Sequence, residues 1–213
     1  MIATNPDAPF WDRVARKYAT DPIRDLAGYE RTVARTRQLL GAAATVLEIG
    51  CGTGTTALKL APSVSRLLGT DVSAEMIAIA REKVAAGTFG NVAFSVAPAS
   101  SDPGTGVLYD AVLAFNVLHL VSDRAATSAA ARRVLKPGGL FISKTPCLSE
   151  MNPLIRMAVP IARWLGKAPS VSVFDSATLE TEIAHAGFTI IERARHGSGR
   201  RDPRIFLVAE KSE

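Results

Sequence analysis

The chain has 213 residues, of which 47% are hydrophobic and 21% charged, with a net charge of +5 and two cysteines. This is enough apolar sequence for one core, so we expect a single domain over residues 1–213. The Lys and Arg residues are scattered along the sequence, which argues against a nucleic-acid-binding surface. The apolar runs are too short to cross a bilayer, and the first residues lack the regions of a signal peptide, so we expect a cytoplasmic protein with reduced thiols.

The first 41 residues read as two helices, and short strand-like runs alternate with helical patterns from residue 45 onward. The helical patterns cover Phe10–Ala19, Pro22–Leu40, Thr55–Ala61, Ala74–Ala86 and Arg124–Leu135, and the strand-like runs cover residues 45–49, 65–71, 91–96, 109–115 and 139–144. Such alternation predicts parallel strands joined by helical crossovers. We therefore expect an α/β fold in which an N-terminal helical cap (residues 1–41) precedes a cofactor-binding core (residues 42–145).

The last third of the chain departs from this alternation. Residues 146–170 are predicted to hold an inserted lid, because Met151–Leu165 is helical in pattern and unusually apolar, although Pro153 and Pro160 limit its regularity. Residues 171–213 are predicted to form a helix followed by a strand hairpin. The helix is expected over Ser176–Ala186 and the two strands over Phe188–Ala194 and Arg204–Glu210.

A glycine-rich turn, Gly50-Cys51-Gly52-Thr53-Gly54, follows the first predicted strand and opens a helix. Glycines let the main chain turn sharply and approach a ligand closely, and a helix start offers unpaired N–H groups. Asp71, at the tip of the second predicted strand, is placed to accept hydrogen bonds from both hydroxyls of a ribose. Alone, Asp71 could be only the N-cap of the next helix. Together with the turn it indicates a nucleoside-containing cofactor.

Details of the turn favour a cationic ligand over a dinucleotide. A dinucleotide-binding turn has the pattern G-x-G-x-x-G, and here Thr55 stands where the third glycine would fall. Glu48, just before the turn, is poorly placed beside a pyrophosphate. Its carboxylate suits an ammonium group instead.

With Glu48 and the G-x-G-x-G turn, the stretch resembles motif I of the class I S-adenosylmethionine-dependent methyltransferases. Further segments resemble motifs of that family in the same order, namely residues 73–77 (SAEMI), 109–112 (YDAV), 135–139 (LKPGG) and 186–188 (AGF). The resemblance implies a Rossmann-like methyltransferase fold, with a mainly parallel sheet, helices on both faces and an antiparallel C-terminal strand. It also implies S-adenosyl-L-methionine as cofactor and methyl transfer to an O, N or S atom of a small, hydrophobic or aromatic acceptor.

The resemblance further implies a set of cofactor-binding residues. They are Tyr18, Glu48, Gly50, Cys51, Gly52, Thr53, Gly54, Asp71, Val72, Ser73, Met76, Ala97, Ala99, Ser100, Phe115, Asn116 and Leu118. One departure concerns the adenine, because many relatives carry an Asp after the third strand and residues 96–102 have Pro or Ala there. Either main-chain groups with Ser100 recognise the adenine, or Asp102 reaches it from a shifted loop.

His119, just past the fourth predicted strand, is the candidate catalytic base, and the alternative is a structural histidine packed beside the cofactor. A base matters for a hydroxyl or carbon acid and hardly at all for an amine or thiolate. The loop around His119 lacks the N/D-P-P-Y sequence that would resemble the motif of nucleic-acid amino-methyltransferases, which argues against an enzyme that modifies bases. No His or Cys pair has metal-ligand spacing, so no metal is expected.

Several alternatives stay open beside a small-molecule methyltransferase: an RNA or protein methyltransferase, a non-catalytic S-adenosylmethionine-binding protein and, more distantly, an NAD-dependent dehydrogenase. Acceptor choice is expected to lie with the lid and with the first helix, where Trp11 and Tyr18 share one side. The apolar lid suits a hydrophobic acceptor, a dimer face or a membrane surface, since Arg156, Arg163 and Lys167 flank it. A monomer and a homodimer are both compatible with the sequence.

Overall fold

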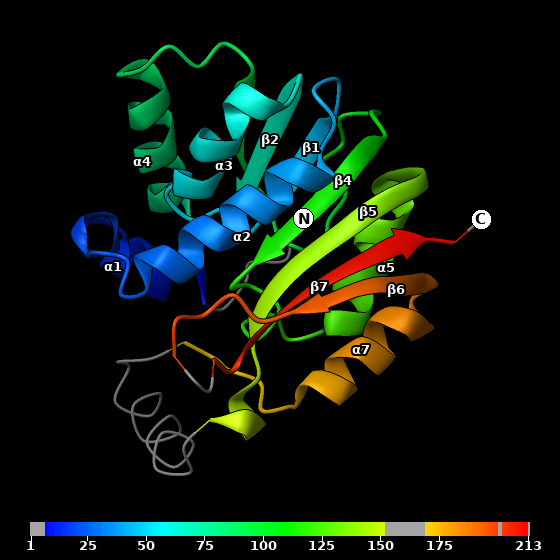
Figure 1. Cartoon of the computed structure of the whole chain (residues 1–213). Helices are drawn as coiled ribbons and strands as arrows, with labels where there is room; N and C mark the ends of the chain where they lie inside the picture. The colour runs from blue at the N-terminus through cyan, green and yellow to red at the C-terminus, as the bar shows by residue number, and fades with distance from the viewer. Residues whose placement is uncertain (1–6, 152–168, 200–201, 213) are drawn as a thin grey trace.

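A single mixed sheet organises the computed structural model, which describes residues 7–151, 169–199 and 202–212. Its seven strands lie in the order β3-β2-β1-β4-β5-β7-β6 (Figure 1). They are β1 (Thr45–Ile49), β2 (Arg66–Asp71), β3 (Val92–Val96), β4 (Tyr109–Phe115), β5 (Leu135–Pro146), β6 (Phe188–Ala194) and β7 (Arg204–Lys211). Strands β1 to β5 pair in parallel, and β7 runs antiparallel between β5 and β6. The predicted α/β fold with an antiparallel C-terminal strand is thereby confirmed.

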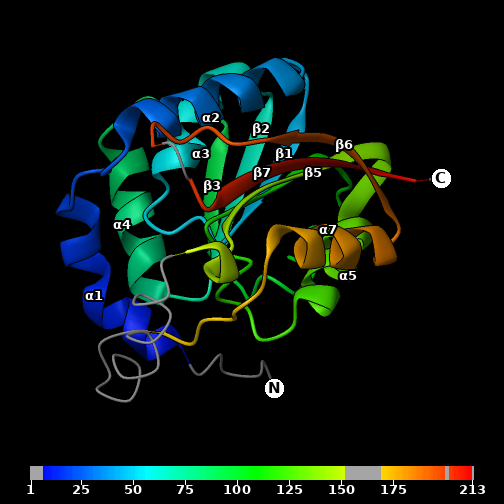
Figure 2. The same ribbon diagram turned by 60° about the horizontal axis from the view of Figure 1, so that its bottom comes forward.

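Helices cover both faces of the sheet. The described ones are α1 (Ala8–Thr20), α2 (Leu26–Leu39), α3 (Thr55–Leu60), α4 (Ala74–Ala85), α5 (Arg124–Val134) and α7 (Ser176–His185), with short 3-10 turns at Ala61–Ser63 and Leu148–Glu150. Side chains alternate between the two faces along a strand. Accordingly Val46 of β1 packs in the core layer of α2, α3 and α4, and its neighbour Leu47 packs in the layer of α5 and α7. Figure 2 shows α2 and α3 on the side of the sheet opposite to α5 and α7.

Two predicted boundaries differ from the structure for local reasons. Helix α2 begins at Leu26 rather than Pro22, because the Asp25 carboxylate caps it and accepts a hydrogen bond from the Gly28 N–H at 3.0 Å. Strand β5 begins at Leu135, earlier than expected, and its pairing with β4 shifts register between Tyr109 and Ala111. The LKPGG segment is therefore an irregular start of β5.

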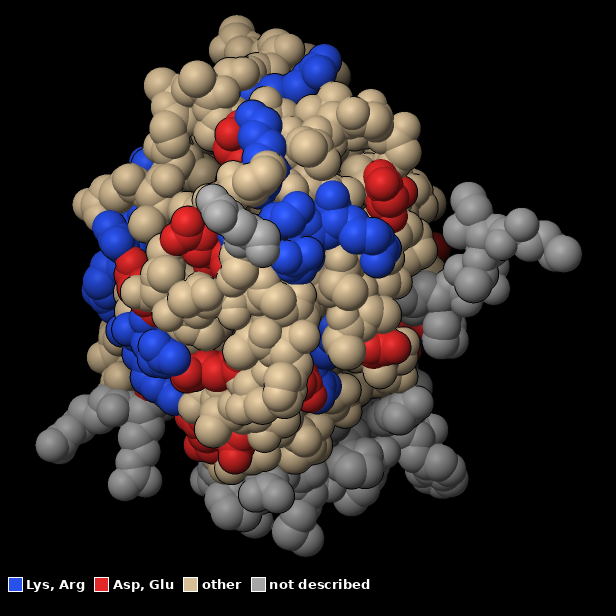
Figure 3. Space-filling view, turned by 90° about the vertical axis from the view of Figure 1, so that its right-hand side faces the viewer, with Lys and Arg blue, Asp and Glu red and all other residues tan. Residues whose placement is uncertain are grey.

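The predicted lid helix falls almost wholly on residues 152–168, outside the described residues. Within the described part, no helix is long and apolar enough to span a membrane. On the face over β6, β7, α5 and α7, groups of Lys and Arg have Asp and Glu beside them (Figure 3). The ion pairs of the described residues include Arg124–Glu182 and Arg193–Glu180, each at 2.6 Å. The surface seen in that view thus carries mixed charge.

Candidate functional site

The three glycines of the turn after β1 differ in what surrounds them, because two are closely packed and one faces open space. Gly50, Gly52 and Gly54 all have positive φ angles, of +66°, +53° and +73°. A Cβ on Gly50 would lie 2.4 Å from Val117, and one on Gly54 would lie 2.6 Å from Phe94, so neither site tolerates a side chain. A Cβ on Gly52 would meet only one α1 side chain, 3.9 Å away. Gly52 is therefore the glycine that lets a ligand approach the backbone.

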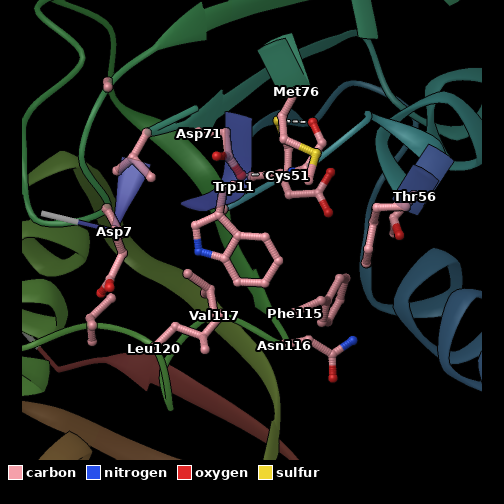
Figure 4. A pocket seen from close by; sticks show the side chains of 18 residues that line it. Asp7, Trp11, Cys51, Thr56, Asp71, Met76, Phe115, Asn116, Val117 and Leu120 are labelled. Carbon is pink, nitrogen blue, oxygen red and sulfur yellow. Dashed lines mark hydrogen bonds between the residues drawn. The ribbon is translucent and has the colours of Figure 1, made fainter. Parts of the chain in front are cut away.

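A pocket lies above this turn, at the carboxyl ends of β1, β2 and β4, and encloses about 930 Å3 including its open mouth. In Figure 4 the indole of Trp11 lies between Asp71 and Met76 on one side and Val117 and Leu120 on the other. The lining residues are Asp7, Trp11, Tyr18, Glu48, Gly50, Cys51, Gly52, Thr56, Asp71, Val72, Met76, Ala97, Ala99, Phe115, Asn116, Val117, Leu120 and Val121. The position matches the crevice in which open α/β sheets bind ligands.

Glu48 contributes a carboxyl group with one oxygen left unsatisfied. Its side chain is 2% exposed, and Oε2 has no hydrogen-bond partner in the described structure. Burial raises the pKa of Glu48 to about 8, against a smaller opposing effect of a hydrogen bond from the Ala57 backbone. A buried carboxyl group of this kind gains a proton or an opposite charge. An orphaned acidic oxygen lining a pocket fits a cationic group on the ligand.

Asp71, at the end of β2, is held by the backbone on both sides. Its Oδ2 accepts a hydrogen bond from the Gly52 N–H and its Oδ1 accepts one from the Ser73 N–H, each at 2.9 Å. Burial raises the pKa of Asp71, and hydrogen bonds from the backbone of Ser73, Gly52 and Val72 oppose that rise. A carboxylate has about four acceptor positions, so capacity remains for a ligand hydroxyl group.

Most of the predicted cofactor-binding residues come together in this pocket. Those that line it are Tyr18, Glu48, Gly50, Cys51, Gly52, Asp71, Val72, Met76, Ala97, Ala99, Phe115 and Asn116. The predicted residues outside the lining are Thr53, Gly54, Ser73, Ser100, Leu118 and His119.

The residues outside the lining have other tasks in the structure. The backbone oxygen and Oγ1 of Thr53 both accept hydrogen bonds from Lys83 Nζ at 2.9 Å, so Thr53 faces α4. Ser73 is fully buried and caps α4 by accepting a hydrogen bond from the Met76 N–H at 3.0 Å. Leu118 is fully buried in the core layer of α5 and α7.

In the loop after β3, neither of the two side chains expected to recognise the adenine, Ser100 and Asp102, lines the pocket. Ala97 and Ala99 line the pocket, whereas Ser100 is exposed outside it. Asp102 is exposed too, and its Oδ1 accepts a hydrogen bond from the Gly104 N–H at 2.8 Å. The Asp102 side chain thus caps its own loop, which leaves the contact with the pocket to residues 97 and 99.

His119 lies outside the lining of the pocket. Desolvation lowers the pKa of His119 to about 4, so the imidazole is neutral at pH 7, and its buried Nδ1 has no partner in the described structure. Its backbone oxygen accepts a hydrogen bond from the Ser172 N–H at 2.9 Å. This histidine ties the segment after β4 to the chain at residue 172.

Six lining residues lie outside the predicted cofactor-binding set, although the prediction for acceptor choice on the first helix did include Trp11. They are Asp7, Trp11, Thr56, Val117, Leu120 and Val121. Trp11 and Tyr18 stack edge to face with ring centroids 6.4 Å apart, as their spacing of seven on one helix side permits. Asp7 Oδ1 accepts hydrogen bonds from both the N–H and the hydroxyl of Ser170 at 3.2 Å. This contact joins residues 163 positions apart, which no local pattern predicts.

Among the described residues, no three His, Cys, Asp or Glu side chains cluster closely enough to hold a metal ion. Both cysteines, Cys51 and Cys147, are buried and form no disulfide.

Comparisons with known proteins agree with this geometry. A family model described as a methyltransferase domain matches residues 46–139. The chain is similar to the ubiquinone/menaquinone biosynthesis C-methyltransferase of Geotalea daltonii, with 36% identity over 102 residues, which are 46% of this chain and 43% of that protein. The match therefore spans less than half the length of that relative.

Solved structures extend the likeness to nearly the whole chain. The CcbJ methyltransferase of Streptomyces caelestis has a TM-score of 0.76 at 21% identity and covers 98% of this chain and 100% of its own. The magnesium protoporphyrin IX methyltransferase of Synechocystis PCC 6803, solved with bound SAH, has a TM-score of 0.72 at 20% identity and covers 97% and 96%. At these identities the likeness is one of fold.

Proposed function

We propose that the chain is a class I S-adenosylmethionine-dependent methyltransferase and that it transfers a methyl group to a small, hydrophobic or aromatic acceptor. S-adenosyl-L-methionine, when bound, supplies a methyl group on a positively charged sulfur, flanked by an adenosine and an amino-acid tail. The proposal rests on one observation above the others, the buried and unpartnered Oε2 of Glu48 in the pocket.

The cofactor side of the pocket matches the parts of such a molecule. Glu48 would hold the ammonium group of the tail, because its buried carboxyl gains most from an opposite charge. Asp71 would hold the ribose hydroxyls with its remaining acceptor capacity. Met76, Ala97 and Ala99, which also line the pocket, would flank the adenine.

The rest of the lining is largely apolar and would receive the acceptor. Trp11, Val117, Leu120 and Val121 supply apolar surface there, beside the polar side chains of Asp7 and Asn116, which favours an aromatic or aliphatic acceptor over a phosphorylated one. The atoms O, N and S are the acceptor atoms we propose. Because the Geotalea relative is named a C-methyltransferase, an activated carbon also belongs in any test of acceptors.

The residues of this chain would act mainly by orientation and by exclusion of water. Fixing a nucleophile in line with the methyl carbon and sulfur supplies a large part of the barrier reduction. The Trp11 indole lies across the pocket (Figure 4) and would restrict how an acceptor enters. His119 lies outside the lining, and a group with a pKa of about 4 is a weak base at pH 7. We therefore assign it no step that requires contact with the acceptor.

Two measurements test the proposal in sequence. Titration calorimetry should show binding of S-adenosylhomocysteine and no binding of NAD, and the reverse result would contradict the assignment of the pocket. A screen with radiolabelled S-adenosylmethionine should then give label in one class among phenol, amine, thiol, carboxylate and activated-carbon acceptors. Label found only in RNA or protein would favour a macromolecular acceptor, and binding without transfer to any acceptor would favour a non-catalytic protein.

A further inference from the structure

Helix α1 is attached to α4 by a carboxylate that completes the start of α4. Oδ1 of Asp12 accepts a hydrogen bond from the Ser73 hydroxyl at 2.6 Å and another from the Glu75 N–H at 3.1 Å. Ser73 itself caps α4 by accepting from the Met76 N–H. A negative charge at this position also interacts favourably with the helix dipole. Asp12 is thus a second cap of α4 that is supplied by another helix.

This junction is linked by hydrogen bonds to the glycine turn. The Gly52 N–H donates to Asp71, and the other oxygen of Asp71 accepts from the Ser73 N–H. The Ser73 hydroxyl then donates to Asp12. A continuous path of four residues therefore runs from the floor of the pocket to α1.

The same helix forms a wall of the pocket. Trp11, next to Asp12 in sequence, and Tyr18, two turns further on, both line the pocket. On the same face, Ala15 is fully buried against Met76 and Ile79 of α4, and Trp11 packs against this cluster. The position of the Trp11 indole is consequently set by how α1 is attached to α4.

The Asp12 junction is screened less by solvent than the ion pairs of Arg16 on the same helix. Arg16 also pairs with Glu75 at 2.6 Å and with Glu82 at 2.8 Å, but its side chain is 59% exposed. Exposed pairs of this kind contribute little. Ser73 is fully buried, so its charge-assisted hydrogen bond to Asp12 carries more weight.

We propose that Asp12 is a positioning residue of the pocket, which acts through Ser73 to hold the Trp11 wall over a ligand bound at Asp71. The inference rests on the proposed function only in taking S-adenosylhomocysteine as the ligand. It makes ligand binding and the placement of α1 interdependent, because both use the path through Asp71 and Ser73.

The test compares Asp12→Ala with Asp21→Ala, which removes an acidic residue next to the end of the same helix and whose partner there is Lys17. Titration calorimetry with S-adenosylhomocysteine should give a Kd raised about tenfold in Asp12→Ala, the scale of one charge-assisted hydrogen bond. Asp21→Ala should stay within about twofold of the parent. Asp12→Asn, whose side-chain oxygen can still accept from Ser73, should recover most of the affinity.

A second readout reports the wall itself. In a Trp164→Phe background Trp11 is the only tryptophan, so acrylamide quenching measures its exposure. S-adenosylhomocysteine should protect Trp11 in the parent and in Asp21→Ala but much less in Asp12→Ala. Trp11 should lose protection in Ser73→Ala as well. The double variant Asp12→Ala with Ser73→Ala should lose no more protection than the more affected of the two single variants.

Parent-like affinity and protection in Asp12→Ala would overturn the inference, as would fully additive losses in the double variant. If Asp12→Ala does not fold, Ser73→Ala decides by the same two measurements. Failure of the parent protein to bind S-adenosylhomocysteine would instead refute the proposed function.

Discussion

Replacing Glu48 by Gln isolates the buried charge, because the amide keeps the shape of the side chain. Burial raises the pKa of Glu48 from 4.5 to about 8, so at pH 7 the folded protein holds a proton that the unfolded chain has released. Stability therefore falls as the pH rises from 4.5 to about 8. At pH 7 this deficit in the free energy of unfolding is on the order of 3 kcal/mol, because each pH unit above the ordinary pKa costs about 1.36 kcal/mol. Glu48→Gln has no such deficit and should raise the Tm of the ligand-free protein by about 5–10 °C.

The same substitution should weaken binding and remove its pH dependence. A ligand ammonium group, itself protonated below about pH 7.5, requires the ionised form of Glu48. With a pKa of about 8 for Glu48, the ionised fraction falls from about a quarter at pH 7.5 to about a hundredth at pH 6. The affinity of the parent for S-adenosylhomocysteine should drop about twentyfold over that range. Glu48→Gln should show no such drop and should bind more weakly than the parent at pH 7.5.

Calorimetry at four pH values between 6.0 and 7.5, together with thermal unfolding at pH 7, checks both effects. Glu30→Gln is a matched control, because the Glu30 side chain is 45% exposed and pairs with Lys59 at the surface. It should change neither the pH dependence nor the Tm appreciably. A parent Kd that stays constant across this range, or a Glu48→Gln variant less stable than the parent, would refute the reasoning.

Three other changes have defined outcomes. Asp71→Ala removes the acceptor of two backbone N–H groups and should weaken S-adenosylhomocysteine binding at least about tenfold by calorimetry. Unaltered affinity would place the ribose elsewhere. Gly54→Ala puts a Cβ 2.6 Å from Phe94 at a φ of +73° and should cost about 2–4 kcal/mol in urea unfolding, whereas Gly90→Ala, with nothing within 4 Å of its Cβ, should leave stability unchanged. His119→Ala should lower kcat less than about threefold and leave the pH profile of kcat between 6 and 8 unaltered, since the pKa of His119 is about 4. A larger loss of kcat together with a changed pH profile would indicate that His119 acts as a base.

The strands of the sheet could be predicted because local sequence patterns mark where each one begins and ends. Tyr109–Phe115 and Phe188–Ala194 have the predicted bounds, since one is a nearly continuous apolar run and the other lies between Gly187 and a polar turn. The start of α2 could also have been found, because Asp25 is a strong N-cap residue ahead of the helical pattern.

The residues of the site could be predicted where a residue type at a given position in the fold has a single function. Glu48 and Asp71 both reach the pocket because they stand at the carboxyl ends of parallel strands. Gly54 shows the limit of this reasoning, since a glycine needed for close packing on Phe94 looks in sequence like one needed for a ligand. Asp7 was not predicted because its contact depends on how α1 lies against residue 170.

Strand β7 gives the fold a particular order of completion during synthesis. It follows β6 along the chain, yet it lies between β5 and β6 and supplies the only sheet partner that β6 has among the described strands. While residues 204–211 are still inside the ribosome, β5 therefore has an unpaired edge and β6 has no neighbour. Such edges are the surfaces through which nascent chains associate wrongly. Productive folding of this chain depends on a late, long-range insertion, so a pause in translation ahead of Arg204 would prolong the state most prone to aggregate.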